Sequence, residues 1–165
     1  AGWGYRRWPP EKFASLGDRL SKSLGVRIVL IGGIGDREAC QQVSSRMSFP
    51  SIMLIQESVR ESTALINRLD LFVSNDTGPM HIAVALGRPT IALFGPGNTV
   101  KYGPRGANVV IITKNLPCSP CPQWFDPCHQ VGRDSQECMK RIEVEEVYQA
   151  AIAFLDLASV RQKWI

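Results

Sequence analysis

Short apolar runs and stretches of helical periodicity alternate along most of the chain. The apolar runs are continuous instead of alternating with polar positions, and only Arg27 interrupts the first of them. Continuous apolar strands are typical of a parallel sheet that helices cover on both faces. The pattern therefore predicts an α/β fold built on a doubly wound parallel sheet. The predicted strands are Val26–Ile31, Ile52–Ile55, Leu71–Ser74, Thr90–Phe94 and Val109–Thr113.

Local signals place the helices between these strands. Gly25 is expected to end the first helix, and Asp36 is interpreted as the N-cap of the second. Ser58 and Glu61 have the spacing of a capping box. Pro79 suits a first helical position, where its missing N–H costs nothing. The predicted helices are Pro9–Leu24, Asp36–Met47, Ser58–Leu69, Pro79–Leu86 and Glu143–Leu157.

The loops that follow the strands are the expected place for a ligand, because open α/β sheets bind ligands outside the carboxyl ends of their strands. Four of the five are rich in Gly, Asp, Ser or Thr, as a phosphate or sugar site requires. These loops are Ala1–Arg7, Gly32–Asp36, Gln56–Ser58, Ser74–Gly78 and Gly95–Tyr102.

The stretch Ser74–Ala83 is the strongest single candidate. It ends a strand in small polar residues and opens a helix at Gly-Pro, so the free N–H groups and the positive end of the helix dipole face any ligand. The alternative interpretation is that Asp76 only caps this helix and that His81 is a hydrogen-bonded core residue.

Composition narrows the class of protein. A chain of 165 residues with 44% hydrophobic and 21% charged positions fits one soluble globular domain. The chain contains no apolar run long enough to span a membrane and no signal-peptide pattern. Its net charge of +4 suits an anionic small ligand or an acidic membrane surface, and is too diffuse for nucleic acid. Because it opens on Ala1 and a Gly/Trp-rich loop, we expect it to be part of a longer protein.

Four of the five cysteines lie where no periodicity is visible. Cys118, Cys121, Cys128 and Cys138 have the spacing C-x₂-C-x₆-C-x₉-C and lie among several prolines. Four soft ligands fit a closed tetrahedral zinc site or an iron–sulfur site. Two disulfides or plain buried thiols are the alternatives. Cys40 is interpreted as a core residue on a helix face.

Several landmarks occur in a fixed order along the chain. They are Arg6-Arg7-Trp8-Pro9-Pro10-Glu11-Lys12-Phe13, Ile31-Gly32-Gly33-Ile34-Gly35-Asp36-Arg37-Glu38, Asp76-Thr77-Gly78-Pro79-Met80-His81, Leu93-Phe94-Gly95-Pro96, and Cys118-Ser119-Pro120-Cys121 with Cys138-Met139. Together they resemble the C-terminal half of glycosyltransferase family 9, the ADP-heptose:lipopolysaccharide heptosyltransferases. The resemblance implies a GT-B architecture of two Rossmann-like domains. It implies that residues 1–165 form a single nucleotide-sugar-binding domain, with a Cys/Pro-rich loop at 113–141 and a C-terminal helix and tail at 143–165.

The resemblance also assigns residues to the donor site. The family's Asp-Thr-Gly-x-x-His maps onto Asp76, Thr77, Gly78 and His81, which it places on the diphosphate and the sugar. Arg6 stands where the family normally has Lys and, with His81, is implied to stabilise the leaving diphosphate. Arg keeps the charge at this position but changes the geometry of the contact.

The remaining donor contacts are assigned in the same way. An acidic residue after the Gly-rich loop holds the ribose in the family, and here Asp36 and Glu38 both fit. Gly2 and Glu57 complete the expected donor-binding set, with main chain near Glu57 meeting the adenine.

The implied activity is an inverting transfer that needs no metal or other cofactor. The donor is an ADP-sugar, and the acceptor is the lipopolysaccharide core, held by an N-terminal domain that also supplies the catalytic base. No catalytic base is therefore expected in this chain, and the chain alone is expected to be inactive. The resemblance implies a cytoplasmic protein at the inner face of the membrane, with peripheral membrane contact and no nucleic acid. The competing hypothesis is a non-catalytic nucleotide- or metal-binding module with a Cys-rich interaction loop.

Overall fold

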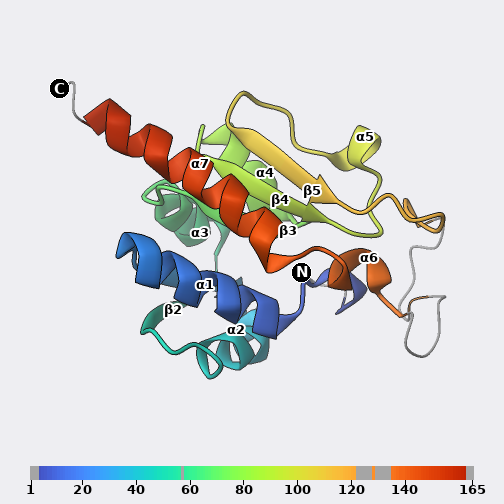
Figure 1. Ribbon diagram of the computed structural model, residues 1–165, viewed down its shortest axis with the longest axis horizontal. Coiled ribbons are helices and arrows are strands. Elements are labelled where there is room, and N and C mark those ends of the chain that lie inside the picture. Colours follow the sequence, from blue (N-terminus) through green and yellow to red (C-terminus); the bar gives the residue numbers. More distant parts are fainter. Residues whose placement is uncertain (1–3, 57, 122–127, 129–134, 163–165) are drawn as a thin grey trace.

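Figure 1 presents the protein as a computed structural model, which describes residues 4–56, 58–121, 128 and 135–162. Strands and helices alternate from the first strand to the fifth. In chain order the elements are η1 (Gly4–Arg6), α1 (Pro10–Leu24), β1 (Ile28–Gly33), η2 (Ile34–Asp36), α2 (Arg37–Ser44), β2 (Ser51–Gln56), α3 (Val59–Ile66), β3 (Phe72–Asn75), α4 (Gly78–Ala85), β4 (Thr90–Phe94), α5 (Thr99–Tyr102), β5 (Val109–Thr113), α6 (Glu137–Lys140) and α7 (Val144–Gln162).

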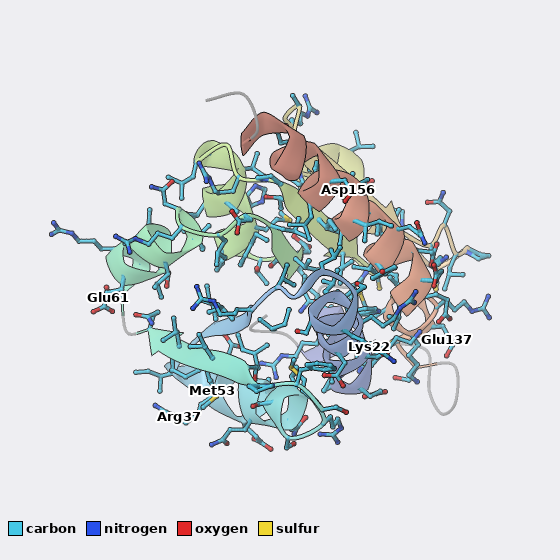
Figure 2. All side chains as sticks on the ribbon, turned by 60° about the vertical axis from the view of Figure 1, so that its left-hand side comes forward. Lys22, Arg37, Met53, Glu61, Glu137 and Asp156 are labelled. Carbon is cyan, nitrogen blue, oxygen red and sulfur yellow. The ribbon has the colours of Figure 1, made fainter. Side chains whose placement is uncertain are left out.

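All strand pairs in the described residues are parallel, which confirms the α/β class. The sequence predicts one sheet, whereas the strands form two, ordered β1-β2 and β3-β4-β5. A cavity lies between β1 and β3 and is lined by side chains of both strands. Figure 2 places β2, labelled by Met53, beside α2, labelled by Arg37, and places α7, labelled by Asp156, on the other side of the molecule.

Helices cover both faces of the three-stranded sheet, as the apolar strands require. Ile91 and Leu93 of β4 pack with α7 and the segment before it, whereas Ala92 and Phe94 pack with Met80 of α4. In Figure 1, α7 crosses one face of this sheet and α4 lies on the other. Successive side chains of β4 point to opposite faces of the sheet, so this strand contributes to both clusters and joins them into one core.

Trp8 ties the beginning of the chain to its end. Its side chain is 1% exposed, and its Nε1–H donates to the carbonyl of Ile142 at 3.0 Å. The ring meets Phe13 edge to face, with the centroids 4.9 Å apart. These contacts fix the segment that leads from η1 into α1.

Most predicted elements are confirmed, with shifted ends. The predicted ranges of β4 and β5 match the structure, and α1 ends at Leu24 with Gly25 in the left-handed conformation (φ 65°). Three helices end earlier than predicted, and α7 runs further, to Gln162. The short helices α5 and α6 are not predicted. Among the described residues, no helix is long and apolar enough to cross a membrane.

Candidate functional site

Two consecutive arginines, at the end of η1 and just after it, reach the ends of two strands. Arg6 Nη1 lies 3.1 Å from Asp76 Oδ2, just after β3, and Arg7 Nη2 lies 3.3 Å from Asp36 Oδ1, after β1. The backbone N–H of Trp8 donates to Asn75 Oδ1 at 2.9 Å and holds this segment against β3. The structure thus brings together Arg6, Asp36 and Asp76, as the sequence predicts for this edge.

Asp76 is almost completely buried, with 8% of its surface exposed. Burial raises the pKa of its carboxyl, and the nearby Arg6 and His81 act against that shift. Its backbone N–H donates to the carbonyl of Leu93 at 3.2 Å, which fixes the turn to β4. A buried carboxylate facing an arginine is suited to exchange that partner for a ligand hydroxyl.

The turn into α4 begins one residue earlier than predicted. Thr77 is the N-cap residue, and Pro79 is the second helical residue instead of the first. The Thr77 side chain makes no capping hydrogen bond and instead lies 3.1 Å from the Ser74 hydroxyl. The alternative in which Asp76 only caps the helix is therefore wrong. Pro79 has no N–H and the Met80 N–H donates to the Thr77 carbonyl at 3.2 Å, so the N–H of Gly78 is the first-turn donor left for an anion.

Asp36 also differs from its predicted role as an N-cap. It is the N-cap residue of α2 by position, but its side chain makes no capping hydrogen bond there. Its Oδ2 accepts from the backbone N–H of Gly33 at 3.3 Å instead, because η2 turns the carboxylate back toward the end of β1. Glu38 is exposed and accepts from Gln42 at 3.3 Å.

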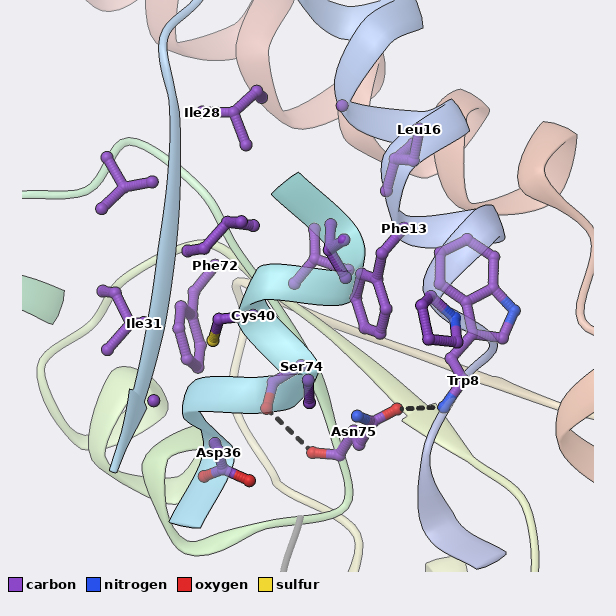
Figure 3. Close-up of a pocket in the computed structure, with 18 of the residues that line it drawn as sticks. Trp8, Phe13, Leu16, Ile28, Ile31, Asp36, Cys40, Phe72, Ser74 and Asn75 are labelled. Atoms are coloured by element: carbon purple, nitrogen blue, oxygen red, sulfur yellow. Dashed lines mark hydrogen bonds between the residues drawn. The ribbon is translucent and has the colours of Figure 1, made fainter. Parts of the chain in front are cut away.

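A cavity of about 980 Å³ opens at this edge and runs inward between β1 and β3. Its polar end includes Asp36 and Asn75, together with Thr77 and Gly78. Its inner part is lined by apolar side chains, among them Ile28, Ile31, Phe13, Leu16 and Phe72, as Figure 3 shows. Cavities of this size with a few polar groups at one end are typical of small-molecule sites.

The other predicted donor residues are exposed at the edge of the site or lie outside the residues that the structure describes. His81 is exposed on α4, near enough to Asp76 to influence the pKa of that carboxyl. Gly78 is exposed at the first helical position. Gly2 and Glu57 lie outside the described residues.

Three residues at the site were not predicted as functional. Asn75 holds the Trp8 backbone, Arg7 pairs with Asp36, and Gly97 packs closely against Asp76. A Cβ added at Gly97 would lie 2.5 Å from Asp76 Oδ2. Asn75 directly precedes the Asp-Thr-Gly turn, and Arg7 directly follows Arg6. Their positions next to these motifs are the signal in the sequence that could have identified them.

The structure describes all five cysteines, and they differ in burial. Cys40 is buried on α2, as predicted, and Cys138 is buried on α6, whereas Cys118, Cys121 and Cys128 are half-buried. Burial, together with the nearby Cys118 and Cys128 thiols, raises the pKa of Cys138 to about 11. In the described part of the chain, no three Cys, His, Asp or Glu side chains stand close enough together to hold a metal ion as they are placed.

These features define a class of protein: a Rossmann-like α/β domain with a charged ligand site at the carboxyl ends of its parallel strands. Residues 1–131 match the family model described as glycosyltransferase family 9 (heptosyltransferase). The chain therefore belongs to glycosyltransferase family 9.

Individual relatives agree with the family match. Lipooligosaccharide heptosyltransferase 2 of Campylobacter jejuni is 26% identical over 151 residues, which are 88% of this chain and 46% of that protein. The crystal structure of the family 9 glycosyltransferase from Veillonella parvula has a TM-score of 0.75 at 29% identity, covering 94% of this chain and 43% of that one. The structure of E. coli heptosyltransferase WaaC with ADP shares the fold, with a TM-score of 0.70 at 21% identity over 93% of this chain and 42% of that one. The chain spans less than half the length of each of these three proteins.

Proposed function

We propose that the chain is the donor-binding, C-terminal domain of an enzyme that transfers heptose from ADP-heptose to the inner core of lipopolysaccharide. Family membership supports glycosyl transfer, and the names of the relatives support heptose as the sugar. ADP in the WaaC structure supports an adenine nucleotide as the carrier.

The observation that carries this proposal is the Arg6–Asp76 pair beside the start of α4. Negative charge builds on the departing diphosphate in the transition state, and fixed donors that face it lower the barrier. Arg6 and the backbone N–H groups of Thr77 and Gly78, at the start of α4, supply such donors without a metal. When the donor binds, Arg6 exchanges Asp76 for phosphate oxygens, and Asp76 accepts hydrogen bonds from sugar hydroxyls.

The same site suggests roles for the neighbouring residues. His81 donates to the diphosphate or to a sugar hydroxyl. Asp36 holds the ribose in preference to Glu38, since Asp36 lines the cavity and Glu38 is exposed beyond η2. The transfer is inverting and requires no metal or other cofactor, and a base on the part of the protein outside this chain activates the acceptor.

The acceptor and the location follow from the same proposal. The lipopolysaccharide core binds to the part of the protein outside this chain, and the protein works at the cytoplasmic face of the membrane through peripheral contact. The chain's 19 basic and 15 acidic residues are spread along its length, which does not favour nucleic acid. The non-catalytic module considered above is not favoured, because the chain belongs to a family of transferases.

Isothermal titration of the chain with ADP, ADP-heptose and UDP tests the donor site. The wild-type chain is expected to bind ADP and ADP-heptose more tightly than UDP. Arg6→Ala is expected to weaken ADP binding by about tenfold or more, since a charge-assisted hydrogen bond contributes about 1.5–3 kcal/mol. Arg19→Ala is the matched control, because Arg19 joins α1 to α7 through Glu145 at 2.6 Å. Failure to bind ADP at millimolar concentration, or equal affinities for both variants, would refute the proposal.

A further inference from the structure

The cysteine-bearing turn is anchored to the loop that follows β4. The hydroxyl of Ser119, next to Cys118, donates to the carbonyl of Gly95. The backbone N–H of Cys121 donates to the carbonyl of Pro96 at 2.8 Å. The two hydrogen bonds hold Cys118 and Cys121 beside the same two loop residues.

Cys138 reaches that loop from the other side. It lies on α6, and a Cβ added at Gly95 would lie 3.1 Å from its Sγ. Segments on both sides of the cysteine loop therefore converge on Gly95 and Pro96, and each brings at least one thiol.

The proposed transfer leaves these four thiols without a role. They fall within 21 residues of sequence, and Pro117, Pro120, Pro122 and Pro127 lie among them. Prolines restrict the backbone and so lower the entropy lost when such a loop is fixed around a ligand. Four thiolates with no other ligand type are the donor set of a closed, structural site.

We propose that Cys118, Cys121, Cys128 and Cys138 together bind one zinc ion. Each thiol releases its proton to solvent and donates a sulfur lone pair, with Zn–S bonds of about 2.3 Å. Zinc has no redox chemistry, which suits a site where three of the four thiols are only half-buried. Binding draws the Cys118–Cys121 turn and α6 together around the ion.

The zinc site would also support the donor site, and this step rests on the proposed function. Gly95 and Pro96 contact the cysteine segments, and Gly97 next to them packs against the Asp76 carboxylate. Fixing Gly95 and Pro96 at one end of this three-residue loop therefore restrains Gly97, which packs beside Asp76. Zinc acts here as a structural group and takes no part in the transfer.

Metal analysis of the reduced chain, expressed with zinc in the medium, tests the inference directly. We expect one zinc per chain in the wild type and a loss of that zinc in Cys118→Ser and Cys121→Ser, both at half-buried positions. Cys40→Ser is the matched control and should keep its zinc, because Cys40 lies on α2. Cobalt replacement gives a second measurement, the intense visible absorption of tetrahedral cobalt–thiolate, which needs no variant to fold.

Each remaining outcome contradicts the inference. A metal-free chain with reactive thiols excludes a zinc site, bound iron with sulfide indicates a cluster, and thiols lost in pairs by mass indicate disulfides. The measurement uses no nucleotide, so zinc binding without ADP binding would leave this inference standing and refute the proposed function. ADP titration of zinc-loaded and zinc-depleted chain then tests the link to Asp76, with weaker ADP binding expected for the depleted form.

Discussion

At the scale of single residues, the site depends on pairs that join distant parts of the chain. Arg6 and Asp76 are 70 positions apart, and Arg7 and Asp36 are 29 apart. Local signals in the sequence identified Asp76, Thr77 and Gly78, because a strand that ends in small polar residues and is followed by Gly-Pro usually turns into the start of a helix. They did not identify Arg7 or Asn75, whose roles come from partners that only the fold brings near.

Gly97 is the residue whose substitution should affect Asp76 most directly. Gly97→Ala places a Cβ 2.5 Å from Asp76 Oδ2 and 3.1 Å from the Phe94 ring, so the loop or the carboxylate must move. We expect a loss of stability of about 1–3 kcal/mol, as is usual for overpacking, and weaker ADP binding. Urea denaturation and titration with ADP measure the two effects.

Gly106→Ala is the matched control in the following loop, because its Cβ would meet Val109 at an ordinary 3.4 Å. Unchanged stability and ADP binding in Gly97→Ala would show that the loop does not restrain Asp76.

Asp18 provides a prediction about pH. Its carboxylate accepts from the backbone N–H groups of Ser48 and Phe49 at 2.9 and 3.0 Å. Burial acts to raise its pKa, but these hydrogen bonds outweigh burial and hold the pKa below its ordinary value. A lowered folded-state pKa stabilises the protein above the unfolded pKa, and this contribution is lost as the pH falls through the folded value.

Asp18→Asn is therefore expected to be less stable than the wild type at pH 7, with the gap closing as the pH falls below the unfolded pKa. Urea denaturation across this pH range measures the gap, and Asp70→Asn, at an exposed carboxylate, controls for the change in net charge. A gap that stays constant with pH would contradict this role for Asp18.

At the scale of elements, the helix and strand ends that depend on short-range features could be predicted from the sequence. The capping box at Ser58 and the left-handed Gly25 are short-range features, and both are confirmed. The sequence predicts that β1 ends at Ile31, before the two glycines, yet Gly32 and Gly33 both pair with β2 through their backbones. Helices α5 and α6 have four residues each, too few to show a periodicity.

The start of α3 tests the capping box quantitatively. Ser58 Oγ accepts from the Glu61 N–H at 3.2 Å, and Glu61 Oε2 accepts from the Ser58 N–H at 3.3 Å. Ser58→Ala is expected to cost about 1 kcal/mol of stability, since one first-turn donor loses its partner. Urea denaturation measures the loss.

Ser62→Ala, inside the same helix, is the control and should change stability by less than about 0.5 kcal/mol. Equal losses in the two variants would mean that the cap contributes nothing of its own.

At the scale of the whole molecule, the apolar pattern predicted the strands but not how they associate. A buried strand shows the same continuous apolar run whichever neighbour it pairs with, so the division into β1-β2 and β3-β4-β5 is not visible in the sequence. The division matters for the site. The cavity between β1 and β3 opens at the edge where Asp36 and Asp76 meet the two arginines, so the carboxyl edges of both sheets contribute to one site.

The last prediction concerns the chain as a unit. It carries the residues proposed to hold the donor but spans less than half of its relatives, and the resemblance places the catalytic base on another domain. We therefore expect the 165-residue chain to bind ADP-heptose without transferring heptose to a lipopolysaccharide core acceptor. Mass spectrometry of the acceptor after incubation detects transfer, and ADP-heptose titration of the same sample confirms that the donor site is intact. Transfer by this chain alone, abolished by Arg6→Ala, would mean that the base lies within these residues.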